Sequence, residues 1–254
     1  MNPNTRSVQP DLCIPDSSPL PVWKRTLDIV CSLSALPVLL PLVTIIALIT
    51  KISSPGPVLF KQSRVGHRGK QFLCYKFRTM QVNADTAGHQ AYLNHLMGSN
   101  APMAKLDAKK DSRLIPGGWI LRATGLDELP QLINVLLGEM SLVGPRPCIP
   151  YEYENYTIWQ KERFASVPGL TGLWQVSGKN KTTFSKMIQL DIEYASTKSL
   201  VLDLKIMLLT FPTLMQQLVE TRMSRKSIIT PSTVAASEAP NVTVQKATAQ
   251  FSAV

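Results

Sequence analysis

The sequence contains 254 residues, carries a formal net charge of +10 and has an isoelectric point near 9.6. A chain of this length forms one large domain or two small ones, and its charge calls for a nucleic acid, an acidic membrane or a phosphorylated substrate as partner. Four cysteines without disulfide or metal-ligand spacing indicate reduced thiols in a cytosolic setting, and three histidines lack the helical spacing of a metal site.

The N-terminal part predicts a membrane segment. Residues 1–21 are rich in Pro, Ser, Asn and Asp, which predicts a disordered leader. The 22 residues from Ile29 to Thr50 carry no charge, and a straight helix of that length, at about 1.5 Å per residue, just spans a bilayer core. Pro37 and Pro41 lie inside this run and can kink it, and the basic residues at both of its ends favour the cytoplasm. For residues 22–51 we therefore favour a re-entrant helical hairpin, broken near Pro37, rather than a simple span.

A basic block follows the apolar run. Between Lys51 and Met80 the chain has seven basic residues and no acidic one, a pattern more typical of membrane binding than of nucleic-acid binding. Within it, Val58–Phe60 and Gln71–Phe77 predict short strands joined by a hairpin loop at Val65–Lys70. Its basic side chains either bind substrate phosphates or anchor the protein to anionic lipid, and the sequence leaves both readings open for Lys61, Arg64, Lys76 and Arg78.

The stretch Arg122–Pro147 is the most informative part of the chain. Pro130 lacks an N–H group and fits only the first turn of a helix, so the helix begins near Leu126. Asp127 and Glu128 then lie at its N-terminus, where the free N–H groups and the dipole favour carboxylates and phosphates. Taken alone, this pattern also fits a simple acidic helix cap.

The end of this stretch predicts a stiff loop. Apolar residues recur at helical spacing after Pro130, and Gly138 is expected to end the helix. The segment Gly144–Pro147 then places Arg146 between two prolines, which restrict its backbone.

The C-terminal part contains weaker signals. Tyr151–Phe164 is a candidate for a charged, aromatic helix, and Val167–Gly172 predicts a turn-rich loop that leads into Trp174 and Gln175, for which we expect core packing and a strand hydrogen bond. Leu200–Val219 is apolar but interrupted by charges and a proline, which favours an interfacial or core position.

Through seven motifs and the order in which they occur, the sequence resembles the bacterial sugar transferase family, the monotopic phosphoglycosyl transferases. The resemblance extends from about Val22 to Met215. The motifs are Lys24-Arg25-x-x-Asp28, the apolar Pro-broken run, Phe60–Gly66, Tyr75–Met80, Leu126–Gln131, Ser141–Pro147 and Pro168–Gly172.

The resemblance implies transfer of a sugar 1-phosphate from a UDP-sugar to undecaprenyl phosphate, with release of UMP, as the first step of exopolysaccharide or glycoconjugate assembly. It implies that Asp127 is the nucleophile and a ligand of the Mg²⁺ cofactor, and that Glu128 assists. It also implies that Arg122 and Arg146 contact phosphate or nucleotide. Three further candidates for substrate binding are Lys76, Arg78 and Lys179, which stands where many relatives have arginine.

The expected fold is a helix-rich α/β protein. It combines the re-entrant membrane helix with a compact cytosolic catalytic domain that has a small sheet and interfacial amphipathic helices. The expected divisions are a leader over 1–21, the membrane helix over 22–51, the catalytic domain over 52–223 and a disordered tail over 224–254.

The expected location is the bacterial inner membrane, with the active site on the cytoplasmic face. The expected partners are the UDP-sugar, undecaprenyl phosphate and membrane lipid, with no nucleic acid, and a homo-oligomer is left open. Two alternatives are a basic membrane adaptor that binds anionic lipid or nucleic acid without catalysis, and an ordinary glycosyltransferase that releases UDP.

Overall fold

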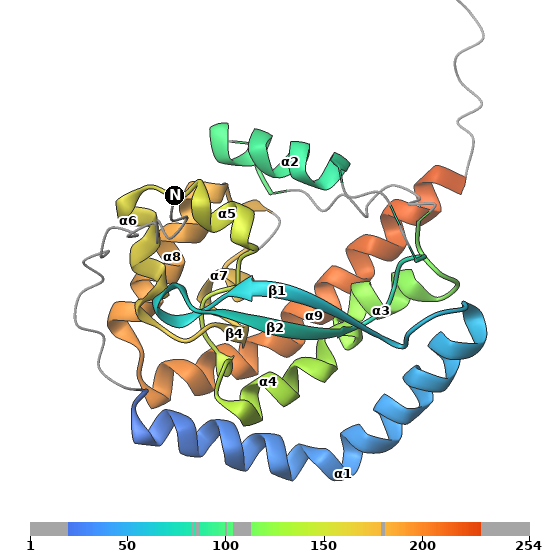
Figure 1. The fold of residues 1–254 in the computed structure, drawn as a ribbon, viewed down its shortest axis with the longest axis horizontal. Coiled ribbons are helices and arrows are strands. Elements are labelled where there is room, and N and C mark those ends of the chain that lie inside the picture. Colours follow the sequence, from blue (N-terminus) through green and yellow to red (C-terminus); the bar gives the residue numbers. More distant parts are fainter. Residues whose placement is uncertain are drawn as a thin grey trace, which may run out of the picture.

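The computed structural model describes residues 20–82, 84, 87–99, 101–103, 113–178 and 181–229. Within them the protein is a helix-rich α/β domain with two small sheets and one long apolar N-terminal helix (Figure 1). Most of the predicted leader and the end of the predicted tail lie outside the described residues. The α-helices are α1 Val22–Ser53, α2 Ala87–Gly98, α3 Gly118–Thr124, α4 Leu132–Leu137, α5 Pro150–Glu154, α6 Ile158–Lys161, α7 Leu173–Val176, α8 Phe184–Thr197 and α9 Leu200–Ile229. The 3-10 helices are η1 His67–Gly69, η3 Leu126–Gln131 and η4 Glu162–Ala165, and the strands are β1 Leu59–Val65, β2 Gln71–Phe77, β3 Ser141–Val143 and β4 Gly169–Thr171.

The first sheet is the predicted hairpin. Strands β1 and β2 pair antiparallel from Leu59 opposite Phe77 to Val65 opposite Gln71. The second strand has the predicted bounds, and the first is longer than predicted because the pairing continues as far as the loop. The Val65 amide also donates to the Cys148 carbonyl at 2.9 Å, which ties the hairpin to the segment that follows Pro147.

The second sheet is a parallel pair that the sequence did not predict. Strands β3 and β4 pair Ser141 with Gly169 and Val143 with Thr171, where a turn-rich loop was expected. The backbones approach so closely that a Cβ atom at Gly169 would lie 2.0 Å from the Gly144 nitrogen. Only glycine fits such an approach, so what looked like turn signals are contacts between neighbouring strands.

The prediction for Trp174 and Gln175 was right about packing and wrong about backbone. Trp174 is buried in the core, and its indole N–H donates to Thr182 Oγ1 at 2.7 Å. Both residues lie in the single helical turn α7 and not in a strand. After the close contact at Gly172, the chain bends away from the sheet and satisfies its N–H groups within that turn.

The apolar core lies between the hairpin, the α5–η4 segment and α8. Helix α8 starts at an N-cap, Thr183, whose hydroxyl accepts the Lys186 amide, and it buries one face of its helical repeat. The main cluster contains Val65, Cys148, Phe164, Phe184, Met187 and Ile188 among its buried members.

Helix α1 is long enough and apolar enough to cross a membrane, by length and composition. The helix is continuous through Pro37 and Pro41, and its axis changes direction partway along its length (Figure 1). Each proline removes one backbone hydrogen bond, which accounts for a bend. The predicted break at Pro37 is not seen as an interruption of the helix, and the re-entrant hairpin stays a prediction.

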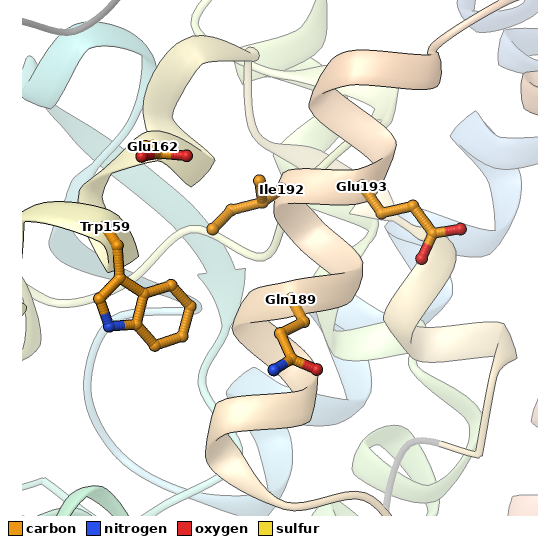
Figure 2. A pocket seen from close by; sticks show the side chains of 5 residues that line it. All are labelled: Trp159, Glu162, Gln189, Ile192 and Glu193. Atoms are coloured by element: carbon orange, nitrogen blue, oxygen red, sulfur yellow. The ribbon is translucent and has the colours of Figure 1, made fainter.

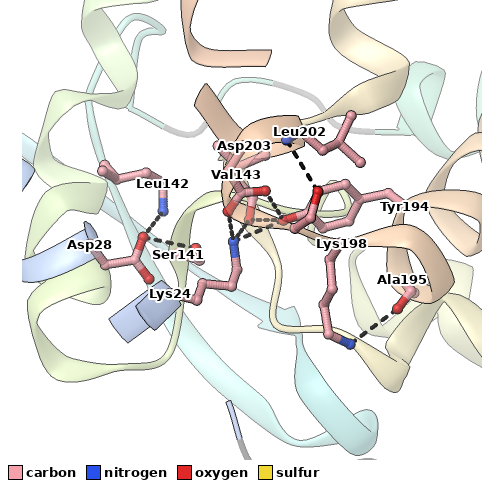
Figure 3. Close-up of polar contacts among 11 residues, drawn as sticks. Lys24, Asp28, Ser141, Leu142, Val143, Tyr194, Ala195, Lys198, Leu202 and Asp203 are labelled. Carbon is pink, nitrogen blue, oxygen red and sulfur yellow. Dashed lines mark hydrogen bonds and ion pairs between the residues drawn. The ribbon is translucent and has the colours of Figure 1, made fainter. Parts of the chain in front are cut away.

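The N-terminal end of α1 is fastened to the domain by buried polar contacts (Figure 3). Lys24 Nζ donates to the Val143 carbonyl and the Tyr194 hydroxyl, both at 2.8 Å, and pairs with Asp203 of α9 at 2.5 Å. Asp28 accepts from the Ser141 hydroxyl and the Leu142 amide. The apolar helix is thus attached directly to β3, the strand that precedes the Pro-Arg-Pro loop.

The C-terminal end of α1 is fastened to the same domain. The Arg78 guanidinium donates to the Ser54 hydroxyl and carbonyl at 2.8 and 2.9 Å and to the Pro57 carbonyl at 2.7 Å. Both ends of α1 therefore contact one compact body.

Candidate active site

The carboxylate pair lies at the start of a short helical segment, as predicted. Gly125 has a left-handed backbone, with φ of 74°, that ends α3 and starts η3, and the Glu128 amide donates to its carbonyl at 3.1 Å. The segment begins at Leu126, but it is a 3-10 helix as far as Gln131, and α-helical geometry starts only at Leu132. The predicted end at Gly138 is confirmed, since that glycine also has a left-handed backbone.

Strand β2 brings a lysine to this pair. Lys76 Nζ lies 3.0 Å from Glu128 Oε1, and the two side chains are 23% and 42% exposed. A partly exposed ion pair of this kind contributes little to stability. It neutralises one of the two carboxylates at the surface where a substrate can reach them.

Asp127 is held in an environment that disfavours its charge. Burial and the neighbouring charge of Glu128 raise the pKa of Asp127 to about 6, although Lys76 and Arg122 oppose this rise. Arg122, on α3, therefore lies within electrostatic reach of Asp127, and its predicted contact with phosphate stays a prediction. The negative charge of the pair is only partly compensated, which favours the approach of additional cations.

The Pro-Arg-Pro loop contacts the same hairpin as this pair. Arg64 of β1 donates to the Pro147 carbonyl at 3.1 Å, and the charges of both Arg146 and Glu128 influence its pKa, which burial lowers. Burial raises the pKa of the Cys74 thiol, and the charges of Lys76, Glu128 and Arg146 also influence it. One strand of the hairpin thus contacts the arginine loop, and the other contacts the carboxylate pair.

Two predicted binding residues are not placed at this site. Arg78 is 5% exposed, and its Nε, Nη1 and Nη2 atoms all donate to the turn after α1, so its guanidinium is committed to holding that turn. Lys179 lies outside the described residues.

Sequence reasoning missed a buried polar network behind Arg146. Glu152, Tyr156, Arg163 and Asp191 are all buried. For the segment Tyr151–Phe164 the sequence predicts only a charged, aromatic helix. Its single signal was the presence of charges among aromatic residues, and this does not show which charges are buried.

The pair can accommodate a divalent cation. Among the described residues, no group of three or more His, Cys, Asp or Glu side chains is arranged to hold a metal. Enzymes commonly bind Mg²⁺ through one or two carboxylates together with substrate phosphates and water. Asp127 and Glu128 supply such a donor set. Burial is the main cause of the raised pKa of Asp127, and the charge of Glu128, which a cation would offset, adds to it. These residues fit Mg²⁺, which stays a prediction.

A separate hollow of about 490 Å³ lies between α6 and α8 (Figure 2). It is lined by Trp159, Glu162, Gln189, Ile192 and Glu193. Two carboxylates and no cation line it, so it repels a diphosphate. The carboxylate pair differs in this respect, because Lys76 and Arg122 lie near it.

The domain thus combines an apolar helix with a carboxylate pair that has a lysine and an arginine nearby. Residues 20–217 match the family described as "Bacterial sugar transferase". The Exopolysaccharide production protein ExoY of Sinorhizobium fredii is 37% identical over 191 residues, which are 75% of this chain and 84% of that protein. The UDP-glucose:undecaprenyl-phosphate glucose-1-phosphate transferase of Caulobacter vibrioides is 40% identical, over 76% of this chain and 69% of that protein. The Undecaprenyl-phosphate galactose phosphotransferase of Salmonella typhimurium is 41% identical, over 74% of this chain but only 39% of that protein.

The chain therefore belongs to the bacterial sugar transferase family, as its motifs predicted. It is an enzyme of the phosphoglycosyl transferase class, of the exopolysaccharide type.

Proposed function

We propose that this protein transfers a sugar 1-phosphate from a UDP-sugar to undecaprenyl phosphate and releases UMP, as the initiating step of exopolysaccharide or glycoconjugate synthesis. The observation that carries the proposal is the partly buried carboxylate of Asp127, flanked by Glu128 and within reach of Lys76 and Arg122. Relatives that are named as undecaprenyl-phosphate sugar transferases support the choice of substrates.

The proposed chemistry proceeds through Asp127. Its carboxylate oxygen attacks the phosphorus that carries the sugar, and the bond from that phosphorus to the bridging oxygen breaks, so that UMP leaves with the electron pair. An oxygen of undecaprenyl phosphate then attacks the same phosphorus of the phosphosugar bound to Asp127. The aspartate leaves as a carboxylate, and the product is the undecaprenyl diphosphate sugar. An ionised carboxylate needs no separate base for this attack.

The other residues assist by charge and position. Lys76 and Arg122 reduce repulsion between Asp127 and the diphosphate, and Arg146 binds a phosphate from the Pro-Arg-Pro loop. Glu128 assists by holding Lys76 and by placing the metal or handling the proton of the acceptor phosphate. Mg²⁺, held by Asp127 and Glu128, supplies additional charge neutralisation when bound.

The attachment of α1 supports a re-entrant membrane helix. A straight helix from Lys24 to Ser54 is roughly 45 Å long, and a helix that spans the bilayer places its two ends on opposite faces. Both of these residues contact one charged domain, which one face alone can accommodate. Between them α1 exposes Val30, Leu33, Val38, Leu40, Ile45, Leu48 and Ile49.

Helix α9 supports interfacial contact. One side faces the domain, where Asp203, Ile206 and Gln217 are buried. The other side exposes Val201, Leu208, Phe211, Val219 and Met223. A helix with such an apolar exposed side is suited to lie at the headgroup boundary, which supports contact with a membrane surface. We place this surface on the cytoplasmic face of the inner membrane because basic residues flank both ends of the apolar run.

The proposal is tested by incubating the detergent-solubilised protein with UDP-sugars, undecaprenyl phosphate and Mg²⁺. We expect UMP release that Asp127→Asn abolishes and that Glu193→Gln, an exposed carboxylate on α8, leaves unchanged. Release of UDP would indicate an ordinary glycosyltransferase. Lipid binding without release of either nucleotide, with every UDP-sugar tried, would indicate a membrane adaptor.

Topology is tested separately with reporters at Asn4 and Gly66. We expect both to map to the cytoplasmic face. Opposite faces would overturn the re-entrant arrangement without affecting the catalytic proposal.

A further inference from the structure

The backbone of Arg146 is held from two sides. Its carbonyl accepts a hydrogen bond from Arg163 Nη2 at 2.8 Å, and the carbonyl of the preceding Pro145 accepts the Gly169 amide at 2.9 Å. Pro145 and Pro147 also limit rotation of the chain on either side. The starting point of the Arg146 side chain is therefore fixed.

The far end of the side chain is held by the same network. Arg146 Nη1 lies 3.3 and 3.5 Å from the two carboxylate oxygens of Glu152, which is fully buried. Glu152 also accepts the Tyr156 hydroxyl at 3.1 Å, and that hydroxyl accepts Arg163 Nη1 at 2.9 Å. Arg163 in turn pairs with Asp191. Arg163 thus touches both the backbone of Arg146 and, through Tyr156, the carboxylate that contacts its guanidinium.

Stability alone does not account for such a network. Burial by itself raises the pKa of Glu152, but the positive charges of Arg146, Arg64 and Arg163 bring it below its ordinary value, so Glu152 stays ionised. Buried ion networks are often no more stable than well-packed apolar side chains of the same volume. What a network of this kind supplies is a single orientation of its members.

Arg146 is the partly exposed member of this network. Its side chain is 27% exposed, whereas those of Glu152 and Arg163 are fully buried. The charges of both Arg146 and Glu128 influence the pKa values of Arg64 and Cys74. The network therefore extends from the core to a partly exposed guanidinium in the loop that β1 contacts through Arg64, while β2 contacts Glu128 through Lys76.

We propose that Glu152, Tyr156 and Arg163 are positioning residues that act through Arg146, holding its guanidinium ready for the diphosphate of the nucleotide sugar. The inference rests on the proposed function. Orientation in advance lowers the entropy lost when substrate binds, so its loss raises KM for the UDP-sugar more than it lowers kcat.

The first test is Tyr156→Phe, which removes only the hydroxyl. The ring that packs near Phe164 and Phe184 is kept. We expect KM for the UDP-sugar to rise about 3- to 10-fold, the size of effect of one buried hydrogen bond, with a smaller change in kcat. The matched control is Tyr151→Phe on helix α5, five residues earlier in the chain, whose hydroxyl donates to Asn94 at the surface, and we expect no change.

The second test is a double-mutant cycle on kcat/KM. In an Arg146→Ala background, Tyr156→Phe should have no further effect, because the group that it positions is gone. Equal effects in both backgrounds, or a KM unchanged from that of Tyr151→Phe, would overturn the inference. If Tyr156→Phe does not fold, Glu152→Gln, which keeps the shape, takes its place in the cycle with the same expectation.

The two levels fail separately. Absence of UMP release by the wild-type protein would refute the proposed function. Wild-type release together with an additive cycle would refute only the positioning role.

Discussion

The protein contains two ionic clusters that differ in how far solvent reaches their charged groups. Around Asp127 and Glu128 the charges are partly exposed, and the pKa of Asp127 is raised because burial and its neighbour outweigh the nearby cations. Around Arg163, by contrast, the carboxylates of Glu152 and Asp191 each contact a guanidinium and are closed off from solvent. A cluster that substrate can reach is suited to chemistry, and one enclosed in the core is suited to holding shape.

The largest difference between the clusters should appear with Asp127→Asn. We expect UMP release to fall at least a thousandfold, since an amide cannot act as the nucleophile. Folding stability at pH 7 should be unchanged or higher. The folded-state pKa of about 6 exceeds the ordinary 3.8, so ionisation of Asp127 costs folding free energy above pH 6, and this cost disappears below about pH 4.

Activity is read by nucleotide release and stability by thermal denaturation in detergent. Retained release, or a large loss of stability at pH 7, would contradict this assignment.

The closed cluster should show the reverse behaviour. Arg163→Met removes the partner of buried Asp191 and the donor to Tyr156 and Arg146. We expect a loss of about 3–5 kcal/mol in the free energy of unfolding, measured with urea. The double replacement Arg163→Met with Asp191→Leu should recover part of this loss. If the double replacement were no more stable than the single one, the cost would not come from an unpaired buried charge.

The pH dependence of kcat/KM tests the open cluster directly. Activity should rise with pH along an acidic limb near the Asp127 pKa of about 6, because the ionised carboxylate is the reactive form. Lys76 lowers that pKa, so Lys76→Met should move the limb to higher pH by about one unit. Glu128 raises it, so Glu128→Gln should move the residual limb to lower pH. Profiles recorded at one fixed Mg²⁺ concentration that coincide for all three proteins would exclude Asp127 as the titrating group.

The smallest effect is expected for stability at the open cluster. Lys76→Met breaks an ion pair whose Glu128 side chain is 42% exposed, so the free energy of unfolding should change by about 1 kcal/mol or less. The same urea titration used for Arg163→Met gives the comparison. A loss as large as that of Arg163→Met would mean that the two clusters contribute equally to the free energy of unfolding.

Local chemistry in the sequence predicted where the carboxylate pair lies along the backbone. Pro130 located the start of the helical segment and Gly138 its end, because each residue restricts the backbone by itself. The same reasoning placed Asp127 and Glu128 in the first turn. It did not predict that this turn is a 3-10 helix, since the choice depends on packing against the hairpin.

Other predictions could not distinguish neighbours in the chain. Lys76 and Arg78 are two residues apart and looked equivalent in the basic block. The structure pairs Lys76 with Glu128 and uses Arg78 to hold Ser54. No local pattern separates these two roles, because each depends on a partner far away in the sequence.

The sequence by itself determined the family, the carboxylate pair, the apolar N-terminal helix and the hairpin strand Gln71–Phe77. These features rest on ordered motifs and on local backbone restrictions. Only the tertiary structure decided the parallel pairing of β3 with β4, the fastening of both ends of α1 to one body and the network behind Arg146. The physical reason is that burial and ion pairing depend on which distant segments meet, and a charge in the sequence does not reveal whether folding will leave it at the surface or enclose it.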